Sequence, residues 1–331
     1  MNLALIGCGA LGARRAEELR ALGAAVVRLV HCADRDLGRA RAAARPHESC
    51  SADTDWRAPL ARRDVEAVIV ATPHDTLAEI ARAAIAAGKH VLVEKPAARR
   101  AGELRGLAAL AAERGIRVRV GFNHRHHRAF RQARTLVDSG ELGTLMFVRA
   151  RYGHGGRPGY EREWRAQPER SGGGELIDQG VHLIDLARWF LGELTQVHGF
   201  VHTYYWDMPV EDNAFLLLKT DAQQTAFLHA SCTEWKNTFS FELYGKGGKL
   251  QIDGLGGSYG TERLTWYRMR PEMGPPDTRT WEYPMADDSW QVELREFCAD
   301  IEQARDPSPG LRDAIAALEI VERVYATAPG A

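Results

Sequence analysis

The sequence predicts an α/β protein with a doubly wound parallel sheet in its first third and a second, α+β domain with a mostly antiparallel open sheet. Short apolar runs alternate with helical patterns up to about residue 122, as in a parallel sheet covered on both faces. A glycine-rich turn joins the first apolar run to the first helical pattern. Beyond residue 122, strand-like runs follow one another with short turns, which is typical of antiparallel strands.

The elements of the first domain, residues 1–122, follow in a regular order. Strands alternate with helices, and right-handed crossovers between parallel strands then produce the doubly wound sheet. The predicted strands are Leu3–Ile6, Val26–Cys32, Val65–Ala71, His90–Glu94 and Arg117–Phe122, and the predicted helices are Ala10–Leu22, Asp75–Ala87 and Ala101–Arg114.

The second domain, residues 123–331, is richer in strand-like runs, and one long helical pattern precedes all of them. The predicted strands are Val197–Tyr205, Ala214–Lys219, Gln224–Ser231, Phe239–Tyr244 and Arg263–Arg270, and the predicted helices are Ile177–Leu191, Trp290–Arg305 and Leu311–Ala326.

The bulk composition is ordinary for a soluble globular protein. Of the 331 residues, 45% are hydrophobic and 26% are charged, and the net charge of −1 gives no sign of nucleic-acid binding. The five cysteines are scattered without a C-x-x-C pair, which argues against a disulfide framework or a structural zinc site. There is no signal-peptide pattern, and no apolar run approaches the ~18 residues of a membrane span. We expect a cytoplasmic protein.

The turn at residues 7–12 (GCGALG) fits the pattern G-x-G-x-x-G. A lone match is weak, but this one follows a predicted strand and opens a predicted helix, as dinucleotide binding requires. The first glycine allows the tight turn and the second lets the backbone approach a pyrophosphate. The third lets the helix pack close to the strand, and the helix N-terminus faces the phosphates. The expected cofactor-binding residues of the turn are Gly7, Gly9, Ala10, Leu11 and Gly12.

Asp34 stands at the end of the predicted second strand. A carboxylate there accepts hydrogen bonds from the adenosine ribose and repels a 2′-phosphate, which favours NAD over NADP. The neighbouring Arg35 leaves NADP open, because an arginine can pair with the additional phosphate or stack on adenine. A solvated loop pair is the alternative interpretation of these two residues.

Glu94-Lys95-Pro96 follows the strand that ends at Glu94. In an open α/β sheet the ligand crevice lies beyond the carboxyl ends of the strands, so Lys95 is well placed to meet a ligand. Pro96 fixes the turn through its restricted φ or through a cis bond. From position alone, a solvated lysine at a strand end is an equally good interpretation.

Asp178, His182 and Asp185 fall on one face of the predicted helix Ile177–Leu191. A carboxylate beside an imidazole sets its tautomer and raises its basicity, which suits proton transfer near neutral pH. The alternative is a capping aspartate and a surface histidine. The glycine run at residues 172–174 favours the first interpretation, because it lets the backbone approach a ligand.

Two further patterns have open interpretations. The spacing of His124, His126 and His127 matches no standard metal-binding pattern, so we expect no metal. The glycine-rich loop at residues 254–260 (GLGGSYG) is either a turn between strands or a nest that contacts a phosphate.

Taken together, these residues resemble the glucose–fructose oxidoreductase / inositol dehydrogenase (Gfo/Idh/MocA) family. The resemblance covers most of the chain: the glycine turn, ATPHDTLAEIARAAIAAGKHVLVEKP, GFNHRHH, SGGGELIDQGVHLIDLARWFLG and VEDNAF occur in the family's order and spacing. It implies an N-terminal Rossmann domain and a C-terminal domain whose open sheet often mediates oligomerisation, here in a homodimer or homotetramer.

Residue by residue, the resemblance assigns Lys95 to the family lysine that contacts substrate and cofactor, and Asp178 and His182 to its D-x-x-x-H pair. The cofactor loop corresponds to Thr72, Pro73 and His74, where asparagine is common at the position of His74, and Glu94 joins the cofactor-binding set. Asn123 corresponds to a position near the nicotinamide, and Trp164-Arg165 to a pair on the substrate loop, which we extend to Tyr160.

The implied activity is hydride transfer between nicotinamide and a secondary alcohol or ketone of a sugar, cyclitol or sugar derivative, including nucleotide-sugars. His182 would act as base, oriented by Asp178, and Lys95 would stabilise developing negative charge. The two alternatives are a redox-neutral NAD-dependent glycosidase and a non-catalytic dinucleotide-binding sensor or regulator. The presence of Lys95, Asp178 and His182 argues against the sensor, since binding alone does not need them.

Overall fold

The computed structural model describes residues 1–327 of the chain, which forms two compact units. The first unit contains Met1–Phe122 and Trp290–Leu318, and the second contains Asn123–Ser289 and residues 319–327. The first unit therefore includes residues 290–318, which the predicted boundaries place in the second domain.

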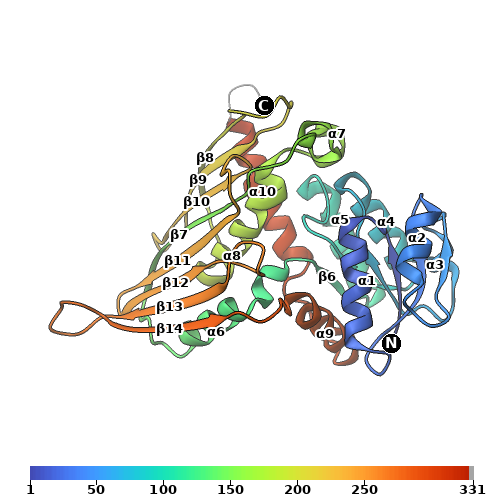
Figure 1. The fold of residues 1–331 in the computed structure, drawn as a ribbon, viewed down its shortest axis with the longest axis horizontal. Helices are drawn as coiled ribbons and strands as arrows, with labels where there is room; N and C mark the ends of the chain where they lie inside the picture. The colour runs from blue at the N-terminus through green and yellow to red at the C-terminus, as the bar shows by residue number, and fades with distance from the viewer. Residues whose placement is uncertain (328–331) are drawn as a thin grey trace. The chain divides into compact units, whose positions relative to one another are not determined.

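A six-stranded sheet with the order β3-β2-β1-β4-β5-β6 forms the centre of the first unit (Figure 1). Its neighbouring strands are all parallel, and the order winds outward from β1 in both directions, which confirms the predicted doubly wound sheet. The strands are β1 (Asn2–Ile6), β2 (Arg28–Ala33), β3 (Ser51–Asp53), β4 (Ala67–Val70), β5 (His90–Val93) and β6 (Val118–Val120), and the helices between them are α1 (Ala10–Leu22), α2 (Leu37–Ala44), α3 (Ala58–Ala61), α4 (His74–Ala86) and α5 (Ala101–Arg114).

Helix α9 (Ser289–Glu302) completes the core of this unit although it comes late in the sequence. Leu294 and Phe297 are both 0% exposed and belong to the same hydrophobic cluster as Leu3 and Leu19. Burial of these side chains explains why residues 290–318 belong to the first unit, in contrast to the predicted domain boundary.

The second unit is built on an eight-stranded sheet with the order β14-β13-β12-β11-β7-β10-β9-β8. Its pairs are antiparallel except for β7 with β10, which confirms the predicted mostly antiparallel sheet. The strands are β7 (Leu145–Gly153), β8 (Gln196–His202), β9 (Asn213–Lys219), β10 (Thr225–Ser231), β11 (Thr238–Gly245), β12 (Gly248–Asp253), β13 (Glu262–Arg268) and β14 (Asp277–Tyr283). The helices are α6 (Arg128–Asp138), α7 (Pro168–Ser171) and α8 (Val181–Leu191), with short helical turns η1 (Asn123–His126), η2 (Tyr160–Arg162), η3 (Trp164–Ala166) and η4 (Leu176–Gly180), and α10 (Leu311–Thr327) has its last part in this unit.

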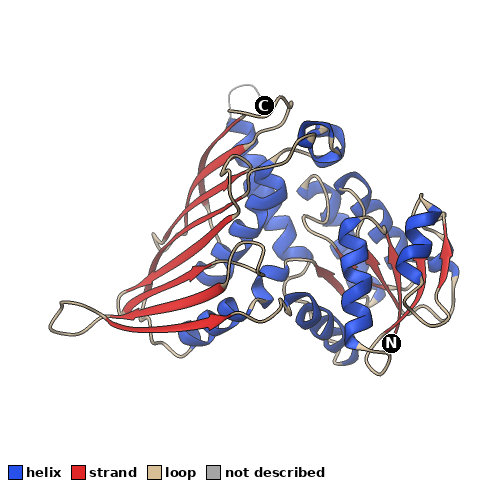
Figure 2. Ribbon diagram, viewed as in Figure 1, coloured by secondary structure: helices blue, strands red, loops and turns tan. Residues whose placement is uncertain are grey.

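The two faces of this sheet differ. In β9, Leu216 and Leu218 are 1% and 0% exposed, whereas Leu217 between them is 52% exposed, as alternation along a strand requires. Helices α6 and α8 contact the strands from one face. Figure 2 shows that no helix of the described residues covers the other face of this sheet.

Strands β7, β12 and β14 of this sheet lie outside the predicted set. The sequence of β14 (DTRTWEY) lacks the alternating apolar pattern by which a strand is recognised. Because β14 is an edge strand, it can form with polar and charged side chains. None of the helices within residues 1–327 is long and apolar enough to cross a membrane.

Candidate active site

The glycine turn after β1 has the geometry of a site for a close-lying ligand. Gly7 has a φ of +90°, and its N–H donates to the Ala33 carbonyl over 2.8 Å. A Cβ on Gly12 would lie 1.9 Å from the Gly7 oxygen, so α1 approaches the turn as only glycine permits. A Cβ on Gly9 would meet nothing within 4 Å, which leaves space over that backbone.

Asp34 is held against this turn at the end of β2. Its Oδ2 accepts a hydrogen bond from the Cys8 N–H at 2.7 Å, and its Oδ1 accepts one from the Asp36 N–H at 2.9 Å. The half-buried carboxylate therefore has a fixed position beside the space over Gly9, whereas the Arg35 side chain is exposed.

The predicted cofactor loop lies at the same carboxyl edge of the sheet. A Cβ on Gly7 would come within 2.9 Å of the Thr72 methyl group, so this threonine lies against the glycine turn. The Thr72 hydroxyl accepts a hydrogen bond from Thr76 at 2.9 Å, and Pro73 precedes α4, which begins at His74. The structure thus brings the loop and the glycine turn together.

Glu94 has a different environment from the one predicted. It is 2% exposed, and its Oε1 accepts a hydrogen bond from the Arg15 Nε at 2.6 Å. Arg15 also lies 2.6 Å from Glu293, so the guanidinium is buried between two carboxylates. The neighbouring Lys95 is half-buried and is joined to Pro96 by a cis peptide bond.

These residues of the first unit fit a dinucleotide, because the open backbone at Gly9, the N-terminus of α1 and the anchored Asp34 carboxylate supply the donors and acceptor that a pyrophosphate and a ribose need. Within residues 1–327 there is no group of three or more His, Cys, Asp or Glu side chains that could hold a metal ion.

In the second unit, Asp178 and His182 lie on one continuous run of helix. Asp178 belongs to η4, a single π-helical turn, and His182 to α8, and they are 6% and 4% exposed. The glycine run before them has a packing role, because a Cβ on Gly174 would lie 2.0 Å from the Glu211 oxygen. Glu211 in turn accepts hydrogen bonds from the Gly174 and Leu176 N–H groups, at 3.0 Å each.

The substrate-loop pair approaches Asp178. The Arg165 Nε donates to the Asp178 Oδ2 at 2.9 Å, and Arg165 stacks on Trp164 at 4.7 Å. The negative charge of Asp178 raises the pKa of the Arg165 guanidinium. Tyr160, by contrast, is 3% exposed and donates its hydroxyl hydrogen to Glu175 at 2.8 Å, so it lies in the core of this part of the unit.

His182 contacts a second histidine. Its Nδ1 lies 2.5 Å from the Nδ1 of His124, and both rings are 4% exposed. Next to them, Arg125 donates two hydrogen bonds to Asp185, at 2.8 and 2.6 Å. Asn123, at the start of the same turn η1, donates to the Ser289 hydroxyl at 3.1 Å.

The glycine loop at residues 254–260 reaches the same cluster. Its Tyr259 ring lies 5.1 Å from the Tyr152 ring, and Tyr152 is edge-on to His124 at 5.2 Å. Burial raises the pKa of Tyr259 to about 12 and that of Tyr152 well above its usual range. The loop thus supplies an aromatic side chain to the surroundings of the histidine pair.

Family models match both parts of the chain. One, described as an oxidoreductase family with an NAD-binding Rossmann fold, matches residues 1–122, and one for the GFO/IDH/MocA C-terminal domain matches residues 130–251. The dTDP-3,4-didehydro-2,6-dideoxy-α-D-glucose 3-reductase of Saccharopolyspora spinosa is 30% identical over 255 residues, which are 76% of this chain and 74% of that protein.

The chain belongs to the Gfo/Idh/MocA oxidoreductase family. Levoglucosan dehydrogenase of Pseudarthrobacter phenanthrenivorans is 33% identical over 160 residues, 48% of this chain and 41% of that protein. The solved structure of an oxidoreductase domain protein from Kribbella flavida is 29% identical, with a TM-score of 0.87 over 98% of this chain and 96% of that one. The chain spans 41 to 64% of the length of three curated relatives that it matches.

Membership of the Gfo/Idh/MocA family confirms the resemblance that the motifs indicated, and with it an NAD-binding Rossmann domain. The sequence indicates no site role for His124 or Tyr152, whose rings lie against that of His182, or for Tyr259, which lies against Tyr152. The GFNHRHH segment contains the signal for His124, but its histidine spacing by itself does not indicate a contact with His182.

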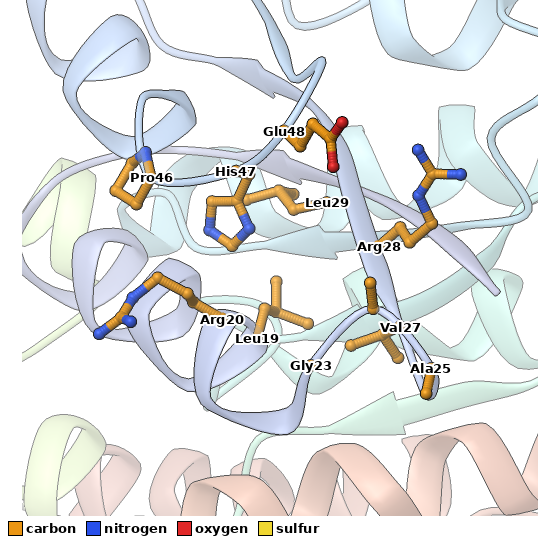
Figure 3. Close-up of a pocket in the computed structure, with 11 residues that line it drawn as sticks. Leu19, Arg20, Gly23, Ala25, Val27, Arg28, Leu29, Pro46, His47 and Glu48 are labelled. Atoms are coloured by element: carbon orange, nitrogen blue, oxygen red, sulfur yellow. The ribbon is translucent and has the colours of Figure 1, made fainter.

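A separate pocket lies elsewhere on the first unit (Figure 3). It has a cavity volume of about 610 Å³ and is lined by the end of α1, the start of β2 and residues 46–48. Because the strands of this sheet are parallel, the start of β2 is at the opposite edge from the glycine turn. This pocket is therefore distinct from the dinucleotide site.

Proposed function

We propose that this protein is an NAD(P)-dependent oxidoreductase that transfers a hydride between nicotinamide and a secondary alcohol or ketone of a sugar, cyclitol or sugar derivative. The observation that carries the proposal is the buried His182, which forms a hydrogen bond with His124. The same chain has, in its first unit, an open glycine turn beside the anchored Asp34 carboxylate. A protein that only bound the dinucleotide would not need a buried proton-transfer group.

The dinucleotide would be held by the glycine turn, by Asp34 and by the loop at Thr72. When bound, its nicotinamide ring supplies the hydride acceptor or donor. Two backbone hydrogen bonds fix the Asp34 carboxylate, so it is ready to accept hydrogen bonds from the ribose hydroxyls. We propose NAD as the preferred cofactor, and the exposed Arg35 as the residue through which NADP is accommodated.

In the proposed reaction, His182 takes the hydroxyl proton during oxidation and returns it during reduction. Asp178 of η4 and Arg165 of η3 form an ion pair, and this pair would position substrate hydroxyls together with Trp164. Lys95 would stabilise negative charge on the reacting oxygen. Asn123 is proposed to contribute to the nicotinamide site, and Tyr160 to support the substrate loop from the core.

This proposal can be tested with a panel of sugars, cyclitols and nucleotide-sugars, each assayed with NAD and with NADP. We expect at least one polyol to give a time-dependent rise in reduced nicotinamide absorbance, with a higher kcat/KM for NAD. Release of an aglycone without net reduction of the cofactor would instead identify a glycosidase. No reaction with any polyol or either cofactor, despite measurable NAD binding, would favour a sensor.

The relatives guide the choice of compounds for the panel. They are named for levoglucosan, for a dTDP-linked deoxysugar and for inositol. These names belong to the relatives, but together they justify including anhydrosugars, nucleotide-sugars and cyclitols.

We further propose that the uncovered face of the eight-stranded sheet joins two copies of the chain. Phe200, Leu217 and Phe227 on neighbouring strands are 74, 52 and 46% exposed. Contiguous apolar surface of this kind is typical of an interface.

Replacing both Leu217 and Phe227 with aspartate should therefore convert the oligomer to monomers, because charges would be buried in the interface without partners. Analytical ultracentrifugation at several concentrations measures this. Met285→Asp, at a side chain that is 53% exposed outside the strands, is the matched control and should leave the mass unchanged. A wild-type protein that sediments as a monomer at all concentrations would refute the interface.

A further inference from the structure

We propose that His124 is a positioning residue for His182, and that the two imidazoles share one proton through their Nδ1 atoms. The catalytic part of this inference rests on the proposed function, in which His182 is the acid–base group. The shared proton itself does not, because it is a property of the unliganded protein.

The geometry of the two rings supports a shared proton. The Nδ1 atoms are 2.5 Å apart, the ring centroids are 3.7 Å apart, and the ring planes cross at 78°. Two bare nitrogens repel each other at this distance, and so do two N–H groups. One ring must therefore carry a proton on Nδ1 while the other presents a lone pair.

The surroundings of the pair disfavour a second positive charge. Phe239 is stacked parallel to His124 with centroids 6.1 Å apart, and Tyr152 is edge-on to His124 at 5.2 Å and to His182 at 6.2 Å. In such a buried, largely aromatic environment, two adjacent imidazolium ions would be strongly destabilised. The pair is therefore expected to take up one proton and to resist a second.

The titratable and charged groups near the pair come from each element packed against it. They are Arg125 and His127 of the segment that carries His124, Tyr152 of β7, Tyr259 of the glycine loop, Asp178 of η4 with its partner Arg165, Glu175 before η4, and Asp185 of α8.

The charges of this group are largely paired. Arg125 is bound to Asp185, and Arg165 to Asp178. His127 contacts Glu262 at 2.9 Å. Asp178 thus has an ion-pair partner in Arg165, and His124 is in direct contact with His182.

The proton can be followed through both directions of the reaction. With Nδ1 engaged by His124, His182 exchanges a proton with substrate through Nε2. When the proton of the contact is on His182 Nδ1, Nε2 is a base that can take the hydroxyl proton of an alcohol. The resulting positive charge is then shared, because the Nδ1 proton can move to His124, which leaves His182 with a proton on Nε2 alone.

In the reverse direction, a ketone receives the Nε2 proton of His182, and His124 returns the Nδ1 proton across the contact. Each step moves one proton between two nitrogens or between nitrogen and oxygen, and no bond in either ring is broken. His124 would thus stabilise the imidazolium form of His182, as a carboxylate does in other acid–base pairs.

Nitrogen NMR of the unliganded protein tests the shared proton without any substrate. Long-range spectra of ¹⁵N-histidine-labelled protein, recorded from about pH 5 to about pH 9, report which ring nitrogens carry protons. The variants His124→Asn and His182→Asn assign the signals of the two rings.

We expect the nitrogens of His124 and His182 to move together in one coupled step in the wild type. In His124→Asn, the titration midpoint of His182 should shift by more than about 0.5 pH unit, because the partner that shares its charge is gone. Phe239→Leu removes the ring beside His124 but keeps both imidazoles, and it should retain the coupled step. If the midpoint of His182 is the same in wild type and His124→Asn, the proposal is refuted.

Activity on a sugar that the panel identifies provides the second readout. The His124→Leu variant should lose about 10²-fold in kcat. The His124→Asn variant keeps a hydrogen-bonding group near the Nδ1 position and should recover part of this loss, with an altered pH profile of kcat/KM. Leucine and asparagine variants with the same kcat and an unchanged pH profile would show that His124 has a packing role only.

The two tests separate the two claims. If no sugar reacts but the histidines titrate as a coupled pair, the proposed function fails and the shared proton stands. If a sugar reacts but the histidines titrate independently, the role of His124 is wrong and the proposed function stands.

Discussion

His182→Ala should lower turnover by ~10²–10⁴-fold while leaving NAD affinity nearly unchanged. The buried imidazole of His182 is the proposed proton acceptor, and its Nδ1 contacts His124. Removal of this imidazole leaves the alcohol without a base. The glycine turn and Asp34, which would bind the dinucleotide, belong to the other unit of the chain. Steady-state kinetics with a reactive sugar and calorimetric titration with NAD give the two quantities.

A matched control for this variant is His229→Ala. His229 belongs to the same unit but lies on strand β10, stacked on Phe215 at 4.3 Å, outside the cluster around His182. This control should retain most of the activity. If His182→Ala instead lost NAD affinity and kept its turnover, the acid–base role of His182 would be wrong.

The second large effect concerns stability. Arg15→Met should lower the free energy of unfolding by about 3–5 kcal/mol, since removing one partner leaves buried charge without compensation. Arg15 is 0% exposed and lies 2.6 Å from both Glu94 and Glu293. Burial already raises the pKa of Glu293, and without the guanidinium this carboxyl would lose its ion-pair partner and face the Glu94 carboxylate.

Urea denaturation, followed by a signal from the first unit, measures this loss. Arg14→Met is the matched control, because Arg14 is the preceding residue but its side chain is 42% exposed in its pair with Glu18. Because solvent reaches the Arg14 guanidinium, although its partner Glu18 is only 6% exposed, we expect a smaller loss for this variant than for Arg15→Met. Similar stabilities of the Arg15 and Arg14 variants would contradict the structural role assigned to the buried cluster.

Local sequence patterns were sufficient to predict five of the six strands of the first unit's parallel sheet, whereas the short edge strand β3 lies outside the predicted set. Its strands are short and apolar on both faces, as in β4 (AVIV), and the glycine turn marks the start of α1. The packing of α9 against this sheet was not predicted, because its apolar residues Leu294 and Phe297 carry no local sign of which surface buries them.

The candidate site shows the same limit. Helical spacing alone placed Asp178 and His182 on one run of helix, but the contact between His182 and His124 joins residues 58 positions apart. Tyr160 was expected to meet substrate because it lies on the substrate loop, yet a buried carboxylate, Glu175, takes its hydroxyl hydrogen bond. Contacts between residues that are far apart in the sequence depend on the packed structure, and the periodicity of the sequence does not reveal them.

The measurement that tests the proposed function most directly is the stoichiometry of the reaction with a polyol from the panel. A hydride-transferring dehydrogenase must form one reduced nicotinamide for each ketone, and a substrate deuterated at the reacting carbon must deliver that deuterium to the cofactor. We expect both results, with mass spectrometry locating the label on the nicotinamide ring. Product formation without net reduced cofactor, or without transfer of the label, would contradict the proposal.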